Sequence, residues 1–505
     1  MINLKRANGI LLHISSLPGS YGIGEIGPEA FTFVDDLAEM GQTLWQILPD
    51  NPTDEYHCPY SATSAFANNP MLISLDNLIR DGWLNLNDVK SYPKTNFKKV
   101  DYPRFEKFKQ DLLSKAAANF EKTKRVNQKF DFENYCEKNQ YWLHDYAVFC
   151  TIQNILGKQQ WIKWPKLFRA HQISVIEDVI EEHGDKIEEI KIIQYLYDVQ
   201  WKELKNYANS KGIKIIGDIP IYVSFNSVDV WTNQNLFKLD KNSKMRFQSG
   251  CPPDEFVDTG QVWGHPIYDW EIHKKDNFSW WINRIIFLYN KVDIIRIDHF
   301  NGFAKYWEIP ASDNHGLNGK WKEGPGVPFF EKVFDKIKSK IILAEDLGEA
   351  FEDSKKIRDV FKIPGMKILQ FSFGSGHPYK DMDPNTVLYT GTHDNNTCVG
   401  WFNELLNNKE LKSEKNSINL SDEVIKYINY KPSESIHWRM IFFAMSSKAS
   451  YCIIPLQDIL GLDDNSRMNI PGTVGNNWIW RFKKQTLDKA IKEKLKLITK
   501  EVHRI

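Results

Sequence analysis

Acidic side chains stand at, or shortly after, the ends of several strand-like apolar runs. A single Asp in such a place is commonly a helix N-cap or a loop residue. Carboxylates that converge from several strands are different, because a concentration of like charge is costly unless it serves chemistry. Four residues share this placement and form the candidate catalytic group: Asp218, Asp298, Glu345 and Asp394.

Arg296 stands two residues before Asp298, and its positive charge limits which reactions the four carboxylates could catalyse. A metal ion held by Asp, Glu and His side chains is conceivable, but the guanidinium would oppose a cation at this point. Beside a carboxylate, Arg instead favours the ionised form that a nucleophile requires. The chain also carries no HExxH, GxSxG or P-loop motif. We therefore expect neither a metal nor an organic cofactor.

Cleavage of a glycosidic bond with retention of configuration fits the remaining groups. It needs an ionised carboxylate nucleophile and a protonated acid, about 5–5.5 Å apart. Neighbouring strands of a sheet lie roughly 4.8 Å apart, so residues at their ends can reach this spacing. Asp298 and Glu345 follow consecutive strand candidates and fit the pair.

The elements that must position these residues form a repeating pattern. Most of the apolar runs are continuous rather than alternating, which is typical of parallel strands buried on both faces. Helical patterns separate them, for example over 28–40 and 277–289. The pattern predicts an α/β fold, a (β/α)₈ TIM barrel with helical and loop insertions between barrel strands. The expected strands are 9–14, 44–48, 213–219, 292–297, 340–344, 366–371, 386–390 and 450–455.

We expect residues 1–505 to form a single catalytic barrel. Two of the segments between its strands are too long to be simple crossover connections. Residues 76–205, between the second and third strands, are expected to form a mostly helical insertion. Residues 225–275, after the third strand, are expected to form a structured loop that covers the active site. The run 22–27 fits GxGxxG, but it starts eight residues beyond its strand, so we interpret it as a rim loop rather than a dinucleotide fingerprint.

Composition excludes several classes of protein. Lys plus Arg equals Asp plus Glu, 65 of each, which argues against a nucleic-acid partner. No apolar run of about 18 residues predicts a membrane span. The six cysteines are scattered and include no CxxC pair, which favours thiols in a reducing compartment, and we expect a cytoplasmic protein. Aromatic residues make up 13%, which suits sugar stacking, although most of them are expected in the core.

Several motifs resemble a known family. The strand-end groups resemble the four signature regions of the α-amylase clan. Longer stretches, in order along nearly the whole chain, resemble amylomaltases, the 4-α-glucanotransferases or disproportionating enzymes of glycoside hydrolase family 77. These stretches are HISSLPG (13–19), GDIPIYV (217–223), PPDEF (252–256), GQVWG (260–264), YTGTHDN (389–395) and RMNIPG (467–472).

The resemblance implies roles for the candidate residues. It makes Asp298 the nucleophile, Glu345 the general acid/base and Asp394 a third carboxylate that grips the sugar at the cleaved bond. Arg296 would orient Asp298. The remaining implied binding residues are His393, Asp218 and Tyr60 around that same sugar, Asp254, Phe256, Gln261 and Trp263 on a mobile acceptor-side loop, and Asn469 along the cleft.

The implied activity is transfer of α-1,4-glucan segments by retaining double displacement through a covalent glycosyl-enzyme. Donors would be malto-oligosaccharides and amylose, and acceptors would be glucans or glucose. A plain α-glucan hydrolase and a catalytically silent glucan-binding protein are the alternatives. The chain departs from the family at Cys58, where a serine is usual, and in the loop 50–57, which affects donor-side detail rather than the reaction.

Overall fold

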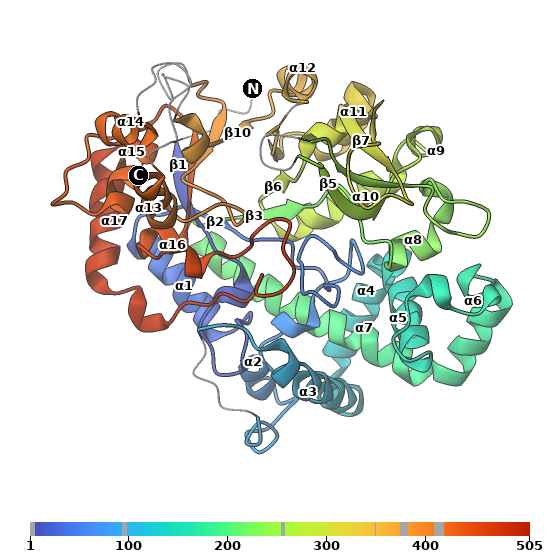
Figure 1. The fold of residues 1–505 in the computed structure, drawn as a ribbon. Coiled ribbons are helices and arrows are strands. Elements are labelled where there is room, and N and C mark those ends of the chain that lie inside the picture. Colours follow the sequence, from blue (N-terminus) through green and yellow to red (C-terminus); the bar gives the residue numbers. More distant parts are fainter. Residues whose placement is uncertain are drawn as a thin grey trace.

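A closed barrel of parallel strands forms the centre of the molecule (Figure 1). The computed structural model describes residues 6–92, 98–253, 258–348, 350–373, 382–408 and 419–504. Within them the barrel order is β1-β12-β11-β10-β9-β6-β3-β2, so all eight expected strands are confirmed. The barrel strands are β1 (Ala7–Leu11), β2 (Leu44–Gln46), β3 (Lys214–Ile219), β6 (Ile294–Ile297), β9 (Ile341–Ala344), β10 (Gly365–Ile368), β11 (Thr386–Tyr389) and β12 (Tyr451–Pro455).

The register of the strands brings the candidate residues to one rim. Ile219 pairs with Ile297, and Ile297 pairs with Ala344, so β3, β6 and β9 end at the same level. The residues of these strands are almost all buried, as expected for a parallel barrel enclosed by helices. Asp298 and Glu345, which follow β6 and β9, therefore stand side by side at the carboxyl-terminal edge.

Helices surround the barrel, and neighbours contact one another: α1 packs on α7 and α17, and α10 packs on α11. Pro28 opens α1 as expected. The predicted helix 277–289 begins two residues later, because Asn277 and Phe278 are left-handed, with φ of 57° and 59°. The helices of the ring are α1 (Pro28–Glu39), α10 (Ser279–Lys291), α11 (Gly326–Ile337), α12 (Phe351–Phe361), α13 (Cys398–Asn407), α14 (Leu420–Tyr427), α15 (Ile436–Ser446), α16 (Leu456–Ile459) and α17 (Lys489–Glu501).

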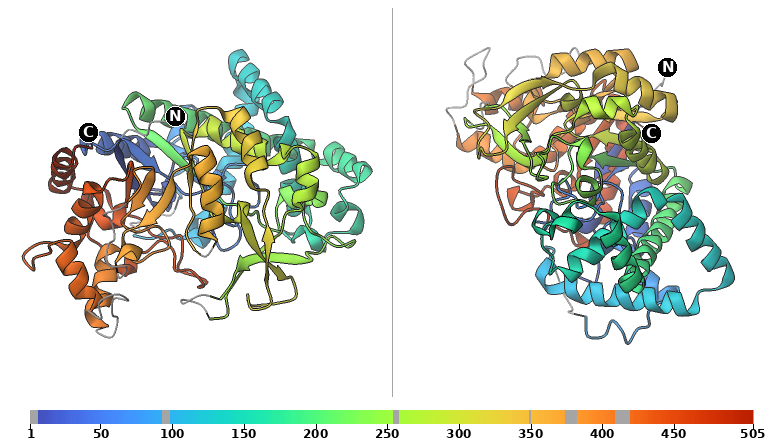
Figure 2. Two further views of the ribbon diagram at one scale, coloured as in Figure 1. Left: turned by 90° about the horizontal axis from the view of Figure 1, so that it is seen from above. Right: turned by 90° about the vertical axis from the view of Figure 1, so that its right-hand side faces the viewer.

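Between β2 and β3, the described residues from 75 onward are mostly helical and gather on one side of the barrel (Figure 2, right). The long last helix of this segment, α7, packs on α3 and α5 and then leads into β3. Buried Lys109 of α3 forms an ion pair with Glu25 of the rim loop, which joins this helical block to the barrel. The helices are α2 (Leu75–Arg80), α3 (Tyr102–Thr123), α4 (Val126–Lys138), α5 (Gln140–Ile155), α6 (Lys166–Arg169) and α7 (Ile173–Ser210).

A second, antiparallel sheet, in the order β5-β4-β7-β8, stands beside the barrel. The segment 225–275, expected to be a structured loop, contributes α8, the strands β4 and β5, and α9 in its described residues. Within this segment β4 pairs with β5, and β4 also pairs with β7, which follows β6, a partnership that no local pattern encodes. The elements are α8 (Val228–Thr232), β4 (Phe247–Cys251), β5 (Gln261–Pro266), α9 (Trp270–Lys275), β7 (Lys305–Pro310) and β8 (Lys320–Glu323).

The rim loop with the GxGxxG pattern packs tightly on the barrel. A Cβ on Gly24 would lie 1.9 Å from the carbonyl oxygen of Ile14, and one on Gly27 would lie 2.3 Å from Ser74 Oγ. These glycines therefore serve close backbone packing, in line with the rim-loop interpretation. In the described part of the chain, no helix is both long and apolar enough to cross a membrane.

Candidate active site

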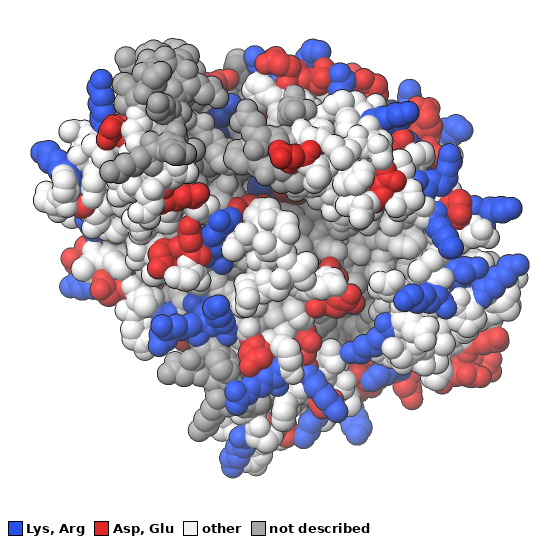
Figure 3. All heavy atoms as spheres, in the orientation of Figure 1, with Lys and Arg blue, Asp and Glu red and all other residues white. Residues whose placement is uncertain are grey.

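A cleft of about 1500 Å³ opens at the carboxyl-terminal rim of the barrel. Its walls include Arg296, Asp298, Glu345 and Asp394, together with the aromatic side chain of Tyr60. The face of the molecule shown in Figure 3 is hollowed near its centre. Active sites of (β/α)₈ barrels lie at this rim, so the candidate carboxylates occupy the expected place.

Arg296 links two of the carboxylates. Its Nη1 donates to Asp218 Oδ2 at 2.6 Å and to Asp298 Oδ1 at 3.0 Å. Burial disfavours the charged guanidinium, but the charges of Asp218 and Asp298 outweigh it and raise the pKa of Arg296 well above its ordinary value. The guanidinium is thus permanently charged, and it stays hydrogen-bonded to Asp298, whose side chain is 28% exposed in the cleft.

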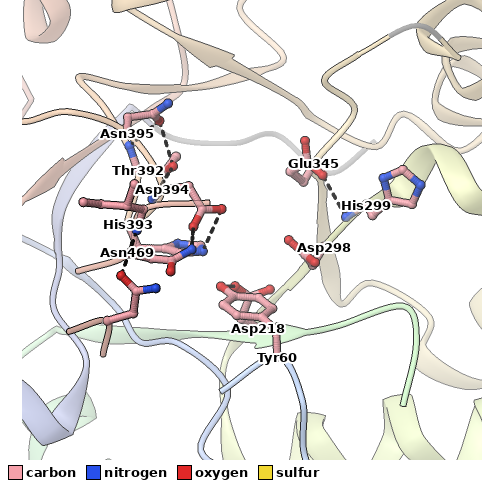
Figure 4. A network of polar contacts seen from close by, with 12 residues as sticks. Tyr60, Asp218, Asp298, His299, Glu345, Thr392, His393, Asp394, Asn395 and Asn469 are labelled. Carbon is pink, nitrogen blue, oxygen red and sulfur yellow. Dashed lines mark hydrogen bonds and ion pairs between the residues drawn. The ribbon is translucent and has the colours of Figure 1, made fainter. Parts of the chain in front are cut away.

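Glu345 is held by the backbone rather than by side chains (Figure 4). The N–H of His299 donates to Oε2 at 2.8 Å, and that of Leu347 donates to Oε1 at 3.1 Å. His299 adopts a left-handed backbone with φ of 46° just after Asp298. Burial, and then the charge of Asp298, raise the pKa of Glu345 to about 7. Glu345 can therefore carry a proton near neutral pH beside the carboxyl group of Asp298.

Asp394 has the opposite electrostatic environment. Asn469 Nδ2 donates to its Oδ1 at 2.7 Å, and His393 Nε2 lies 3.3 Å from its Oδ2. Burial by itself raises the pKa of Asp394, but the charge and hydrogen bond of His393, with Asn469, lower it to about 2. Asp394 is thus ionised throughout the neutral range, and its side chain is 43% exposed.

Tyr60 forms one wall of the site, next to these groups. Its hydroxyl donates to Asp218 Oδ2 at 2.8 Å. Its ring stacks on that of His393, with centroids 4.9 Å apart and planes inclined by 14°. Trp478 lies against both rings, at 5.8 Å from each. The loop after β2, the turn after β11 and the C-terminal segment thus meet at one aromatic cluster.

Of the four residues expected on the acceptor side, the structure describes two. Gln261 and Trp263 lie on β5 and line the cleft, and Trp263 Nε1 donates to Gln261 Oε1 at 3.2 Å. The ring of Trp263 meets that of His299 edge to face at 4.8 Å. Asp254 and Phe256 lie outside the described residues.

Three features of the site were not found from the sequence. They are the backbone donors of His299 and Leu347, the ring of Trp478, and Arg467, whose guanidinium reaches the turn that carries Asp394. A backbone N–H group is present in almost every residue, so its role as a donor cannot be predicted from the residue type. Arg467 begins the RMNIPG stretch, whose likeness to the family marked that segment but not the function of this side chain.

The positive charge that balances the carboxylates Asp218 and Asp298 is supplied by a side chain of the protein. Arg296 stands between Asp218 and Asp298, where a bound cation would meet its positive charge. Among the described residues, no cluster of three or more His, Cys, Asp or Glu side chains is arranged to hold a metal ion.

The barrel and its rim define the class: a (β/α)₈ protein whose cleft carries acidic side chains at the carboxyl ends of its strands. A family model described as 4-alpha-glucanotransferase matches residues 12–487, and the chain belongs to this family. The resemblance seen in the sequence is thereby confirmed.

Relatives match over nearly the full length. A 4-alpha-glucanotransferase of Streptococcus pneumoniae is 40% identical over 99% of this chain and 98% of its own length. The chloroplastic/amyloplastic 4-alpha-glucanotransferase of Solanum tuberosum is 40% identical over 96% of this chain and 83% of its own. The amylomaltase from Streptococcus agalactiae, solved in complex with acarbose, superimposes with a TM-score of 0.93 at 36% identity, covering 99% of this chain and 100% of that one.

Proposed function

We propose that the chain is a 4-α-glucanotransferase. It moves an α-1,4-glucan segment from a malto-oligosaccharide or amylose to the 4-hydroxyl of an acceptor glucan or of glucose. Family membership supports the activity. The observation that carries the mechanism is the pair Asp298 and Glu345, which follow neighbouring strands and differ in their electrostatic environments.

The reaction proceeds in two steps. In the first, Asp298 attacks the anomeric carbon while Glu345 gives its proton to the glycosidic oxygen as the C–O bond breaks. This leaves a glycosyl ester on Asp298 and releases the shortened glucan. In the second, an acceptor 4-hydroxyl gives its proton to Glu345 and attacks the same carbon. The two inversions retain the configuration and restore both carboxyl groups.

The remaining groups bind the sugar at the cleaved bond. The Asp218 side chain is fully enclosed, and its Oδ2 accepts from Arg296 and Tyr60, so it holds these two groups in place. Its Oδ1 has no hydrogen-bond partner among the described residues, but contact with a sugar hydroxyl, as the resemblance implies, would require the surrounding side chains to move. Asp394 is ionised and half-exposed beside it, and we assign it the grip on the sugar hydroxyls that strengthens in the transition state. The ring of Tyr60 supplies an apolar wall for the same sugar.

Maltotriose alone tests the activity. Transfer of a maltosyl unit yields glucose and longer chains, while the number of reducing ends stays constant. A hydrolase raises the number of reducing ends instead, and a silent binding protein changes neither quantity. A chain-length ladder together with a reducing-end assay therefore distinguishes the proposed transferase from both alternatives.

The pH dependence of the first step follows from Glu345. This step needs the protonated carboxyl group, whose pKa is raised to about 7. Because protonation is complete below this pKa and lost above it, kcat/KM for maltotriose should fall on the alkaline side with an apparent pKa of about 7. Rates measured between about pH 5 and pH 9 check this. A profile that stays flat through neutrality would contradict the acid role.

Trp263 is expected to keep water away from the glycosyl ester. Water, at roughly 55 M, competes with dilute acceptor sugars, so the site must suppress it by geometry. Trp263→Ala should raise the ratio of hydrolysis to transfer, while the first step survives. Trp321→Ala, an exposed site on β8 of the same sheet, is the matched control. Free glucose and reducing ends measured against chain redistribution decide the question, and an unchanged ratio in folded Trp263→Ala would contradict the proposal.

A further inference from the structure

The side chain of Arg467 holds the turn that carries Asp394. Arg467 Nη2 donates to the backbone oxygen of Asp394 at 2.7 Å, and Nη1 donates to Asn396 Oδ1 at 2.8 Å. Its Nε donates to the backbone oxygen of Asn469 at 3.3 Å. Asn469 in turn donates its side-chain amide to the Asp394 carboxylate. One guanidinium thus fixes both the backbone of Asp394 and the residue that orients its carboxylate.

Asn396 shows that this contact belongs to a wider network. Its side-chain amide donates to Asp464 Oδ2 at 2.7 Å, while its backbone oxygen accepts from Gln370 Nε2 at 2.7 Å. Asp464 Oδ1 also accepts from the backbone N–H of Thr397 at 2.9 Å. The turn 392–397 is therefore bound on one side by Gln370, two residues beyond β10, and on the other by the segment 464–469.

This anchoring matters because Asp394 reaches into the open cleft. Its side chain is 43% exposed, and its two oxygens meet Asn469 and His393. A carboxylate that grips a sugar must be held within about 0.5 Å of its productive position. Small displacements are costly in rate, since a shift of about 1 Å can lower it roughly 10²-fold.

Arg467 also stands at the base of a loop that lines the cleft. Residues 471–477 form part of the cleft wall, and Val474 is 81% exposed. The base of this loop is closed by the N–H of Trp478, which donates to the Met468 oxygen at 2.7 Å, and the N–H of Asn469 donates to the His393 oxygen at 3.0 Å. The cleft loop 471–477 and the Asp394 turn are therefore joined through Asn469.

We propose that Arg467 is a positioning residue for Asp394, one that fixes the turn 392–397 and joins it to the cleft loop 471–477. The inference rests on the proposed glucan transfer, and in particular on the role of Asp394 there. Arg467 does not touch the sugar. It acts through the backbone of Asp394 and through Asn469, so its loss should affect the transition state rather than binding of the donor in the ground state.

The test compares Arg467→Met with Arg467→Lys on maltotriose and on α-maltosyl fluoride. Met keeps the apolar stem but removes every donor, and Lys keeps the charge but lacks the planar set of donors. Arg467→Met should lower kcat about 10²-fold, with KM changed by less than about threefold. Arg467→Lys should fall between Met and wild type. The loss should be equal on both donors, because Asp394 acts on the sugar and not on the leaving group.

Arg481→Met is the matched control. Arg481 is a more deeply buried arginine of the same C-terminal segment, and its guanidinium donates to the backbone oxygens of Leu17 and Gly19 rather than to the Asp394 turn. The Arg481→Met substitution should lower the melting temperature and leave kcat per folded molecule unchanged. If Arg467→Met behaves like Arg481→Met, with kcat within about threefold of wild type, Arg467 is merely structural and the inference is overturned.

A second variant keeps the inference testable if Arg467→Met does not fold. Asn396→Ala removes the Nη1 acceptor and should lower kcat about tenfold in the same pattern. Where both fold, their effects should be less than additive, because they break one network, and full additivity would overturn the inference. A wild-type protein that makes no maltotriose ladder would instead refute the proposed function, so the two failures are distinct.

Discussion

Asp298→Asn is expected to abolish glucan transfer in a protein that remains folded. An amide cannot form the glycosyl ester, so kcat should fall by at least about 10⁴-fold. The substitution keeps the shape of the side chain, and Arg296 keeps its 2.6 Å bond to Asp218. Removing one of several neighbouring negative charges also relieves repulsion in the site. The melting temperature should therefore stay within a few degrees of the wild-type value.

The measurement uses kcat on maltotriose and on α-maltosyl fluoride, with the melting temperature recorded alongside. Both donors need the nucleophile, so both rates should be lost together. Asp422→Asn, on the exposed first turn of α14, makes the same charge change outside the cleft and should leave both rates intact. Residual turnover above about one tenth of the wild-type rate would assign the nucleophile to another residue.

The barrel could be predicted from the sequence because its strands are local features. Each is a short, continuous apolar run such as 213–219, and parallel strands enclosed by helices need this pattern. The candidate carboxylates followed from the same runs, since residues at the carboxyl ends of barrel strands share one rim. Asp298 and Glu345 could thus be paired before any contact between their elements was known.

The second sheet could not be predicted, because its pairing is not local. β4 pairs with β7 across more than fifty residues, and every residue of β8 is exposed. A strand without a buried face shows no apolar pattern, so 320–323 is indistinguishable from a loop in the sequence. Gly250 of β4 packs against the Gln261 backbone, an environment that exists only once β5 is in place.

The carboxylates, and the placement of Arg296 beside Asp298, could be predicted from the sequence, but the burial and the backbone donors that surround Glu345 could not. The raised pKa of Glu345 depends on burial and on the distance to Asp298, and its two partners are backbone N–H groups. The left-handed turn at His299, which presents one of them, has no residue signature. Tyr60 was placed by resemblance alone, because it reaches Asp218 across 158 positions of the chain.

Glu345→Gln is expected to slow the reaction of maltotriose much more than that of α-maltosyl fluoride, whereas Asp298→Asn should abolish both. An amide cannot give a proton to the leaving oxygen, and general acid catalysis contributes about 10²- to 10⁴-fold. Transfer from maltotriose should fall by that amount. Fluoride leaves without protonation, so the first step with α-maltosyl fluoride should stay within about tenfold of the wild-type rate.

The same variant should also lose the alkaline fall in kcat/KM, since the group that titrates near pH 7 is gone. Its stability should drop only slightly. The two oxygens of Glu345 accept from His299 and Leu347, and Gln must turn its NH₂ group toward one of these donors, which costs about 1 kcal/mol. Release of fluoride at the start of the reaction, compared with maltotriose turnover, measures the donor difference directly. Near-native activity of Glu345→Gln on maltotriose would remove Glu345 from the acid role, whereas equal loss on both donors would make it a residue that orients the sugar.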